Sequence, residues 1–201
     1  MKKNIIVAIF LALLSTTLVA EDKSGWYMGL GYGSTAYEDD DMGKENYPTY
    51  MGELDKDTDN GVVIYGGYKI NNYISVEGSY RDYGEFTYKG SYNSTVEAQS
   101  IAISGNLGYP FLENQLRPFV ILGVGYVYTD TKNSAFAVID DDVASLHVGF
   151  GLEYEPNSLN GLGFRIAYEG DAYTYEVVRP GSDKEYDVGL GQLYFGVQYR
   201  F

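Results

Sequence analysis

The feature that most constrains this chain is an alternation of side chains that recurs in eight separate segments. In each segment bulky apolar or aromatic residues take every second position, and glycine, small or polar residues lie between them. A period of two indicates a β-strand whose two faces meet different surroundings. The segments lie at residues 25–35, 60–70, 73–83, 97–107, 117–128, 144–154, 162–171 and 187–201. Each is long enough to cross a bilayer obliquely, for which roughly 9–11 residues suffice.

The composition favours an all-β fold. The 201 residues include 25 glycines and 22 tyrosines, and neither type favours a helix. The chain has no cysteine, which excludes disulfides and thiolate metal sites. The alternation is least regular in the fifth segment, where Phe119 and Ile121 share a face with Gly123 and Gly125.

Two barrels are compatible with this alternation, and they differ in which face points inward. A soluble, secreted barrel would turn the bulky face inward around a ligand. An eight-stranded barrel has room inside only for modest side chains or one small ligand, so the small and charged face fits its interior better. Aromatic residues also lie near strand ends, as in an interfacial girdle: Trp26, Tyr32, Tyr80, Tyr128, Tyr154 and Tyr199. We therefore expect an eight-stranded antiparallel transmembrane β-barrel.

The connections alternate in length, which predicts the orientation. Long connections at 36–59, 84–96, 129–143 and 172–186 alternate with short ones at 71–72, 108–116 and 155–161. Outer-membrane barrels have long loops outside and short turns in the periplasm. An even number of strands leaves both chain ends on the periplasmic side. The first long loop is acidic, with nine Asp or Glu residues against Lys44 and Lys56.

The amino end predicts export. Lys2 and Lys3 precede an apolar run at 5–14, and Leu18-Val19-Ala20 come just before charged residues. This order is typical of a signal peptide, so we expect a leader at 1–20 and the barrel at 21–201. The net charge of −14 becomes −16 once Lys2 and Lys3 are removed. Such a charge disfavours a nucleic-acid partner.

The first and last segments resemble the small outer-membrane β-barrel superfamily, which includes OmpA-type transmembrane domains, OmpX-like proteins and adhesin-like relatives. The resemblance rests on the signal peptide, on residues 25–33 (GWYMGLGYG) and on the carboxyl end Tyr199-Arg200-Phe201. It implies a bacterial outer-membrane location, lipid and lipopolysaccharide as surroundings, and insertion by the barrel assembly machinery. It also implies an assembly signal at alternate positions of the last strand: Leu193, Phe195, Val197, Tyr199 and Phe201. Because the sequence ends at Phe201, we expect no peptidoglycan-binding domain.

Candidate chemistry is sparse, so we expect no catalytic residue, cofactor or metal site. His147 is the only histidine and lies on the expected inner face. Some barrels of this kind are lipid A deacylases with a serine two residues after a histidine, a position that is Gly149 here. The acidic clusters at 38–41 and 140–142 offer oxygen ligands for Ca²⁺ or Mg²⁺ but lack an ordered ligand spacing. We interpret them as solvated loops.

Charged residues on the expected inner face form a candidate lumen network. Glu77 and Arg81 lie four residues apart on one strand, as do Arg165 and Glu169, and Glu153 and Arg165 flank one turn. We expect these groups to pair and to fill the lumen, because buried charges need compensation. The alternative is a gate across a narrow polar pore. The complete predicted network is Glu77, Arg81, His147, Glu153, Arg165, Glu169 and Arg200.

These features favour a non-catalytic barrel with a structural, surface-interaction or adhesion role, with the possibility of an unidentified extracellular ligand. The main alternative is a narrow porin-like channel for ions or small solutes. A lipid-modifying enzyme is the third and least supported class. The three classes differ in conductance and in activity on lipid A.

Overall fold

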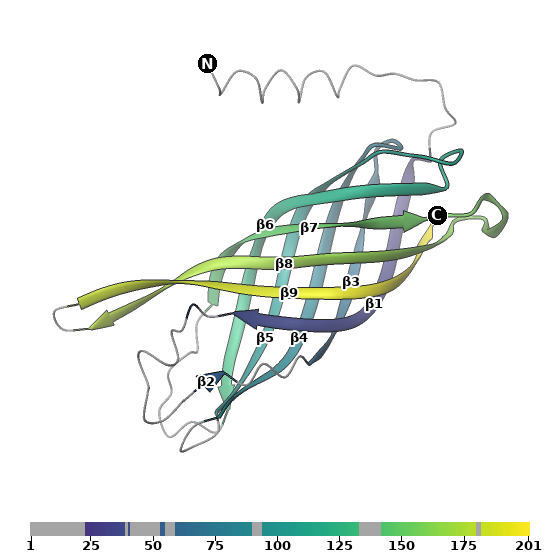
Figure 1. Cartoon of the computed structure of the whole chain (residues 1–201). Helices are drawn as coiled ribbons and strands as arrows, with labels where there is room; N and C mark the ends of the chain where they lie inside the picture. The colour runs from purple at the N-terminus through teal and green to yellow at the C-terminus, as the bar shows by residue number, and fades with distance from the viewer. Residues whose placement is uncertain are drawn as a thin grey trace, which may run out of the picture.

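Eight long strands close into an antiparallel barrel, as the alternation predicts (Figure 1). The computed structural model describes residues 23–38, 40, 53–54, 59–89, 94–132, 142–179 and 182–201. The barrel strands are β1 (Gly25–Glu38), β3 (Asn60–Lys69), β4 (Ile74–Lys89), β5 (Ser94–Gly108), β6 (Leu116–Lys132), β7 (Asp142–Tyr154), β8 (Leu162–Arg179) and β9 (Ser182–Arg200). The expected signal peptide at 1–20 lies outside the described residues and stays a prediction.

Antiparallel pairing between the first and last strands closes the barrel. β1 pairs with β9 from Tyr27↔Arg200 to Glu38↔Gly189. Every other neighbouring pair of barrel strands follows chain order, so around the barrel the strands run β1, β3, β4, β5, β6, β7, β8, β9. A two-residue strand, β2 (Glu53–Leu54), adds to the end of β4. The expected eight-stranded antiparallel architecture is confirmed.

The strands extend further toward the long loops than predicted. The expected connection at 172–186 is almost entirely strand, because β8 and β9 stay paired as far as Arg179↔Ser182. Likewise, β4 continues to Lys89 and β5 begins at Ser94 within the expected 84–96 connection. Backbone hydrogen bonds between strands form without lipid. Two strands can therefore stay paired beyond the residues whose apolar alternation predicted them.

Three short connections gather at one end, here named the short-turn end. After β3, Asn71 Oδ1 accepts hydrogen bonds from the backbone N–H groups of Tyr73 and Ile74, at 2.8 and 2.9 Å. After β7, a short 3-10 helix (Asn157–Leu159) precedes Asn160 and Gly161, both at positive φ. No helix among the described residues is long and apolar enough to cross a membrane. The start of β1 and the end of β9 lie at this same end (Figure 1).

The outer face of the barrel carries the bulky side chains. Trp26 is 65% exposed and Leu122 64% exposed, and both belong to a large set of exposed apolar side chains on this face. An apolar surface of that extent is typical of contact with a membrane. The predicted assembly signal lies on this face too, where all five residues are exposed: Leu193, Phe195, Val197, Tyr199 and Phe201. Their role in assembly remains a prediction. The orientation of the bulky face is confirmed and excludes the soluble barrel with that face inward.

Inward-facing glycines make room for large lumen side chains. A methyl group added at Gly29 would meet the ring of Tyr65, and one added at Gly31 would meet the ring of Tyr194. The inward exception of the fifth segment, Phe119, packs with both tyrosines in one buried apolar cluster. The full cluster is Tyr27, Val63, Tyr65, Phe119, Ile121, Ala167 and Tyr194. The glycines of the inner face therefore leave the space that large side chains of the same interior fill.

Gly33 and Gly189 offer a direct test of packing along the β1–β9 seam. A methyl group at Gly33 would overlap the backbone of Leu193 and Tyr194, whereas nothing lies within 4 Å of one at Gly189. We expect Gly33→Ala to lower the free energy of unfolding by about 1–3 kcal/mol, the usual cost of overpacking. Gly189→Ala should change it by less than about 0.5 kcal/mol. Urea unfolding in lipid vesicles measures both, and equal stabilities would contradict the seam geometry.

The placement of the connections predicts which positions are reachable from outside the cell. Cysteines introduced at the exposed residues Asp40 and Glu185 lie at the long-loop end, whereas one at the exposed Ser158 lies at the short-turn end. We expect a membrane-impermeant maleimide to label intact cells at Asp40→Cys and Glu185→Cys only, because long loops face outward. Ser158→Cys should label only after the outer membrane is permeabilised. Labelling of Ser158→Cys on intact cells would reverse the assigned orientation.

Candidate functional site: a charged network in the lumen

The centre of the lumen is occupied by the guanidinium group of Arg165 on β8. It donates two hydrogen bonds to the Glu77 carboxylate, at 2.9 and 2.7 Å, and one to Glu153 Oε1 at 2.7 Å. Its planar face lies 4.0 Å from the ring centroid of Tyr65 and 4.9 Å from that of Phe119. Arg165 is 1% exposed. A buried guanidinium is tolerated here because carboxylates and aromatic faces replace its hydration.

A second arginine lies further toward the long loops. Arg81 on β4 forms a buried ion pair with Glu169 and lies 3.5 Å from the amide oxygen of Gln192. The hydroxyl of Tyr194 donates to Glu169 Oε1 at 2.7 Å. His147 Nε2 lies 3.7 Å from Glu169 Oε2. Glu169 therefore gathers groups from β4, β7 and β9 around one carboxylate.

Asp171 is the centre of a third layer. It accepts hydrogen bonds from the hydroxyls of Tyr83, Ser100 and Ser145 at 2.7, 2.7 and 2.8 Å. His147 Nδ1 lies 3.1 Å from Asp171 Oδ1. Both ring nitrogens of His147 thus face carboxylates, which makes the histidine part of the packing rather than a group open to a substrate.

Toward the short-turn end the network continues through Arg117 on β6. Its Nη1 lies 3.1 Å from Glu153 Oε2. Its remaining nitrogens donate to the backbone carbonyls of Asn72, Tyr73 and Asn106 at 3.0–3.3 Å. One side chain therefore ties β6 to β7, to β5 and to the turn after β3.

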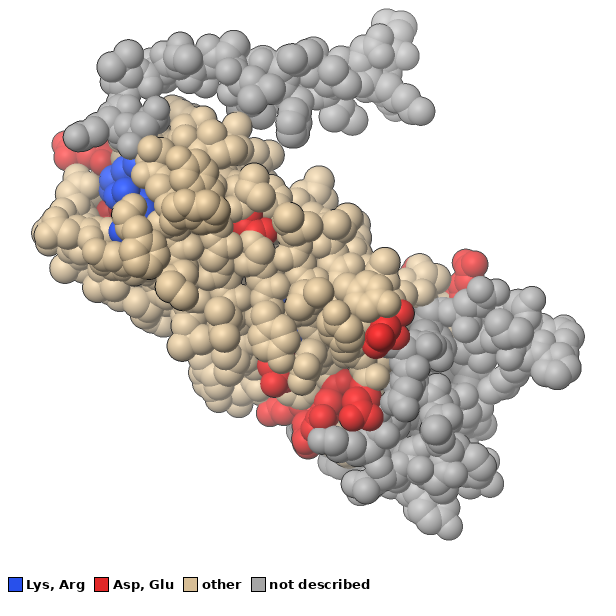
Figure 2. All heavy atoms as spheres, turned by 180° about the vertical axis from the view of Figure 1, so that it is seen from behind, with Lys and Arg blue, Asp and Glu red and all other residues tan. Residues whose placement is uncertain are grey.

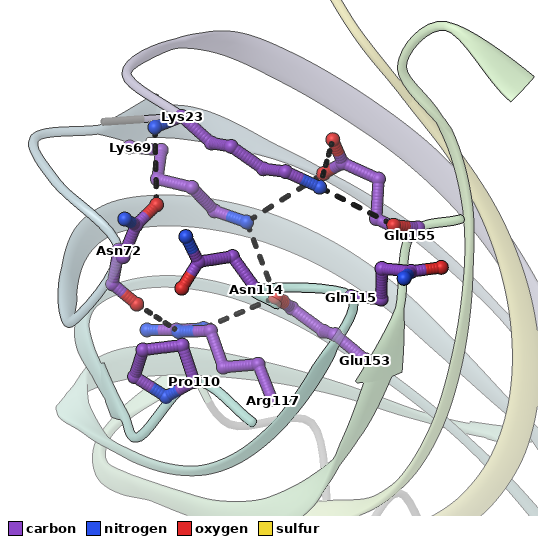
Figure 3. Close-up of a pocket in the computed structure, with 9 residues that line it drawn as sticks. All are labelled: Lys23, Lys69, Asn72, Pro110, Asn114, Gln115, Arg117, Glu153 and Glu155. Atoms are coloured by element: carbon purple, nitrogen blue, oxygen red, sulfur yellow. Dashed lines mark hydrogen bonds and ion pairs between the residues drawn. The ribbon is translucent and has the colours of Figure 1, made fainter. Parts of the chain in front are cut away.

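The mouth at the short-turn end carries a separate cluster around Glu155. Arg200 Nη2 lies 2.7 Å from Glu155 Oε1, and Lys23 Nζ lies 3.4 Å from the same oxygen. Lys69 connects the two clusters, with its Nζ 3.4 Å from Glu153 Oε2 and 3.9 Å from Glu155 Oε2. Figure 3 shows Lys23, Lys69, Glu153 and Glu155 around a cavity.

Two ion pairs cross the full width of the barrel. β4 and β8 are four strands apart in either direction around the barrel, so they face each other across the lumen. Arg165 on β8 pairs with Glu77 on β4, and Arg81 on β4 pairs with Glu169 on β8. We name these two pairs the cross-lumen rungs. They link opposite walls and occupy the axis of the barrel.

This arrangement corrects two sequence-based expectations. Glu77 and Arg81 do not pair with each other; Glu77 pairs with Arg165 and Arg81 pairs with Glu169, both across the lumen. Arg200 does not join Glu153 and Arg165 but pairs with Glu155 at the mouth. Of the other expected contacts, Arg165 lies 2.7 Å from Glu153 and 3.8 Å from Glu169.

Sequence reasoning missed four members of the network: Lys69, Arg117, Glu155 and Asp171. Lys69, Arg117 and Asp171 follow the inward parity of β3, β6 and β8, so alternation alone could have identified them. Glu155 lies just past the end of β7, where parity no longer applies. Of the acidic clusters at 38–41 and 140–142, the described members Glu38, Asp40 and Asp142 are all exposed.

The cross-lumen rungs predict unequal effects of removing neighbouring charges. Arg165→Met should lower the free energy of unfolding by about 3–5 kcal/mol, because it leaves Glu77 buried without its cation. Adding Glu77→Gln should recover most of that loss. Adding Glu153→Gln instead should recover much less. In the Arg165→Met protein, Glu153 is still paired with Arg117 and Lys69, so its removal relieves no unpaired charge. Urea unfolding in vesicles measures all three proteins, and equal recovery by the two second substitutions would contradict the pairing.

Comparison with known proteins agrees with this architecture. The family described as "Outer membrane protein beta-barrel domain" matches residues 5–201. "Outer membrane protein A" of Escherichia coli O157:H7 is 32% identical over 209 residues, and that of Escherichia fergusonii is 34% identical over 215 residues. Each alignment covers 100% of this chain but 55% and 56% of the relative, so the chain spans about half the length of these curated relatives.

Solved barrels share the fold at lower sequence identity. Neisserial surface protein A has a TM-score of 0.59 and 16% identity, covering 89% of this chain and 98% of the other. OprG from Pseudomonas aeruginosa also has a TM-score of 0.59, with 15% identity and coverage of 89% and 97%. With the matching family and the exposed apolar surface, these findings locate the protein in the bacterial outer membrane. The chain belongs to the outer membrane protein β-barrel domain family.

Proposed function

We propose that this protein is a non-catalytic outer-membrane barrel whose role is structural and surface-directed, and whose lumen does not form a standing pore. The observation that carries the proposal is the pair of cross-lumen rungs. Arg165–Glu77 and Arg81–Glu169 place four charged side chains on the barrel axis, each nearly or fully buried. An ion entering the lumen would have to break ion pairs that are already hydrogen-bonded.

The contacts of His147 support a role without catalysis. Its two ring nitrogens lie 3.1 Å from Asp171 and 3.7 Å from Glu169, and the side chain is buried. A general base must reach the proton that it removes from a substrate or a water molecule. Among the described residues, the polar contacts of this imidazole are with the carboxylates of Asp171 and Glu169, which belong to the lumen network.

The charge distribution supports a surface role at the long-loop end. Acidic side chains gather there, whereas the visible basic groups lie at the opposite end (Figure 2). The exposed acidic residues of this end include Glu38, Asp40, Asp142, Glu185 and Asp187. A surface of this sign repels polyanions and favours contact with cationic groups.

A narrow channel is the second candidate, and the polar character of the lumen favours it. Several buried polar atoms have no hydrogen-bond partner within the described part of the chain, among them Arg81 Nε, Arg165 Nε and both side-chain polar atoms of Asn106. Polar atoms of this kind commonly bind internal water. Water beside the rungs would offer a route for small ions if the rungs opened.

Single-channel recording in planar bilayers separates these functions. We expect the unmutated protein to give only brief, small openings, because both rungs block the axis. Replacing one rung with Arg165→Met and Glu77→Gln should leave the lumen closed, since Arg81–Glu169 remains. Replacing both rungs, by adding Arg81→Met and Glu169→Gln, should raise the fraction of time in an open state.

The control is Asp130→Asn, which changes an exposed charge on the outer face of β6. It should leave the recordings unchanged. Heat-modifiable gel mobility establishes that each variant is a closed barrel before recording. A large, steady conductance of the unmutated protein would exclude the sealed lumen and establish the channel instead.

A further inference from the structure

The mouth at the short-turn end contains a cavity that the cross-lumen rungs do not use. It is a small recess whose enclosed part has room for about one water molecule. The empty space of about 270 Å³ includes the open mouth in front of it. Lys23, Lys69 and Arg117 line it together with Glu153 and Glu155 (Figure 3). The side chain of Asn114 extends among these charges from the turn between β5 and β6 (Figure 3). The cavity thus combines cations with amide groups, both of which bind oxygen atoms.

The ammonium group of Lys69 has unused donors inside this cavity. Its side chain is 7% exposed, and its Nζ makes one hydrogen bond, to Glu153 Oε2 at 3.4 Å. Glu155 Oε2, at 3.9 Å, is beyond hydrogen-bond distance. An ammonium group carries three N–H donors. Apart from the Tyr27 ring, whose centroid lies 6.0 Å from Nζ, the other donors of this largely buried lysine have no acceptor among the described residues. That is costly unless an acceptor enters the cavity.

The neighbouring carboxylates are already engaged by other cations. Glu153 accepts hydrogen bonds from Arg117 and Arg165, and Glu155 accepts them from Arg200. Lys23 Nζ lies 3.4 Å from Glu155 Oε1, and its side chain is 17% exposed. The carboxylates therefore have little capacity left for Lys69.

The local charge around the cavity is positive. Four cations, Lys23, Lys69, Arg117 and Arg200, surround two carboxylates, Glu153 and Glu155. With the exposed carboxylate of Glu113, which precedes Asn114 in the turn, an excess of one positive charge remains. Figure 2 shows the basic groups at this end of the molecule, with acidic groups beside them. A small anion would therefore be attracted to the mouth and would find donors there.

We propose that the open mouth of this cavity binds a small oxyanion group, a phosphate or a carboxylate, with one of its oxygen atoms entering the recess beside Lys69, its principal donor. Lys23 and the amide of Asn114 complete the site from the mouth. The anion belongs to a free small molecule or to the headgroup of a lipid at the adjacent membrane surface. This site is independent of whether the lumen conducts, because the cross-lumen rungs lie beyond Glu153.

Phosphate binding in a phosphate-free detergent tests the site. The full barrel is folded in octyl glucoside micelles, and inorganic phosphate replaces chloride at constant ionic strength. We expect saturable shifts of the backbone amide resonances of Asn72, Asn114 and Gln115. Lys69→Met should weaken the phosphate affinity about tenfold or more, since a charge-assisted hydrogen bond is lost. Lys23→Met should weaken it by a smaller factor.

Lys184→Met is the matched control, because it removes a lysine from β9 near the opposite end of the barrel. It should leave the phosphate affinity unchanged. Glu155→Gln removes a carboxylate from the cavity and should tighten phosphate binding. A gain in affinity cannot result from misfolding, so this test does not depend on a loss of fold. The site is excluded if shifts at the mouth do not saturate, or if Lys69→Met and Lys184→Met bind phosphate equally. It is also excluded if Glu155→Gln fails to bind more tightly.

Two further titrations distinguish the source of the anion. Acetate and a short-chain phosphatidylglycerol are added separately, and competition with phosphate at the same resonances is measured. Competition by phosphatidylglycerol at a lower concentration than by free phosphate would support a lipid headgroup. Tighter binding of free phosphate or acetate would support a small periplasmic solute. Failure of all three anions to shift the mouth resonances would overturn the proposal.

Discussion

The barrel interior depends on salt bridges that join opposite walls. Arg165 and Glu77, together with Arg81 and Glu169, connect β8 to β4 through the lumen. Burying a single charge is far more costly than burying a matched, hydrogen-bonded pair. Inward-facing glycines supply the space that these long side chains need, and tyrosine rings pack against the guanidinium groups. The apolar exterior and the charged interior are thus formed by alternate positions of the same strands.

The same alternation made most of the fold predictable. A period of two divides the side chains between two opposite faces, and the glycine spacing indicates which of these faces fits a narrow interior. It correctly predicted eight strands and an outward apolar face. It did not predict strand ends near the long loops, since Tyr173–Arg179 continue a ladder that no bilayer requires.

Pairing inside the lumen was harder to predict. The alternation shows that a side chain points inward, but not its level along the barrel axis or the strand that it faces. Glu77 and Arg81 share a face, yet their partners come from β8, the strand farthest from them around the barrel. Strand tilt and stagger decide which groups meet at one level, and neither can be read from spacing in one strand. Arg200 was misassigned for the same reason, since its partner Glu155 lies beyond the last residue of β7.

The closing ladder between β1 and β9 determines when the barrel becomes stable during folding. Tyr27 and Arg200 are neighbours in the sheet although almost the whole chain lies between them. The two ion pairs between β4 and β8 likewise form only after β8, the seventh strand of the barrel, is in place. Pairings so distant in sequence form slowly, because loop-closure entropy is lost before the contacts are made. A partly inserted chain would therefore contain buried arginines without partners and a strand edge without hydrogen bonds. We expect the barrel to become stable only when the final strand pairs, in one cooperative step.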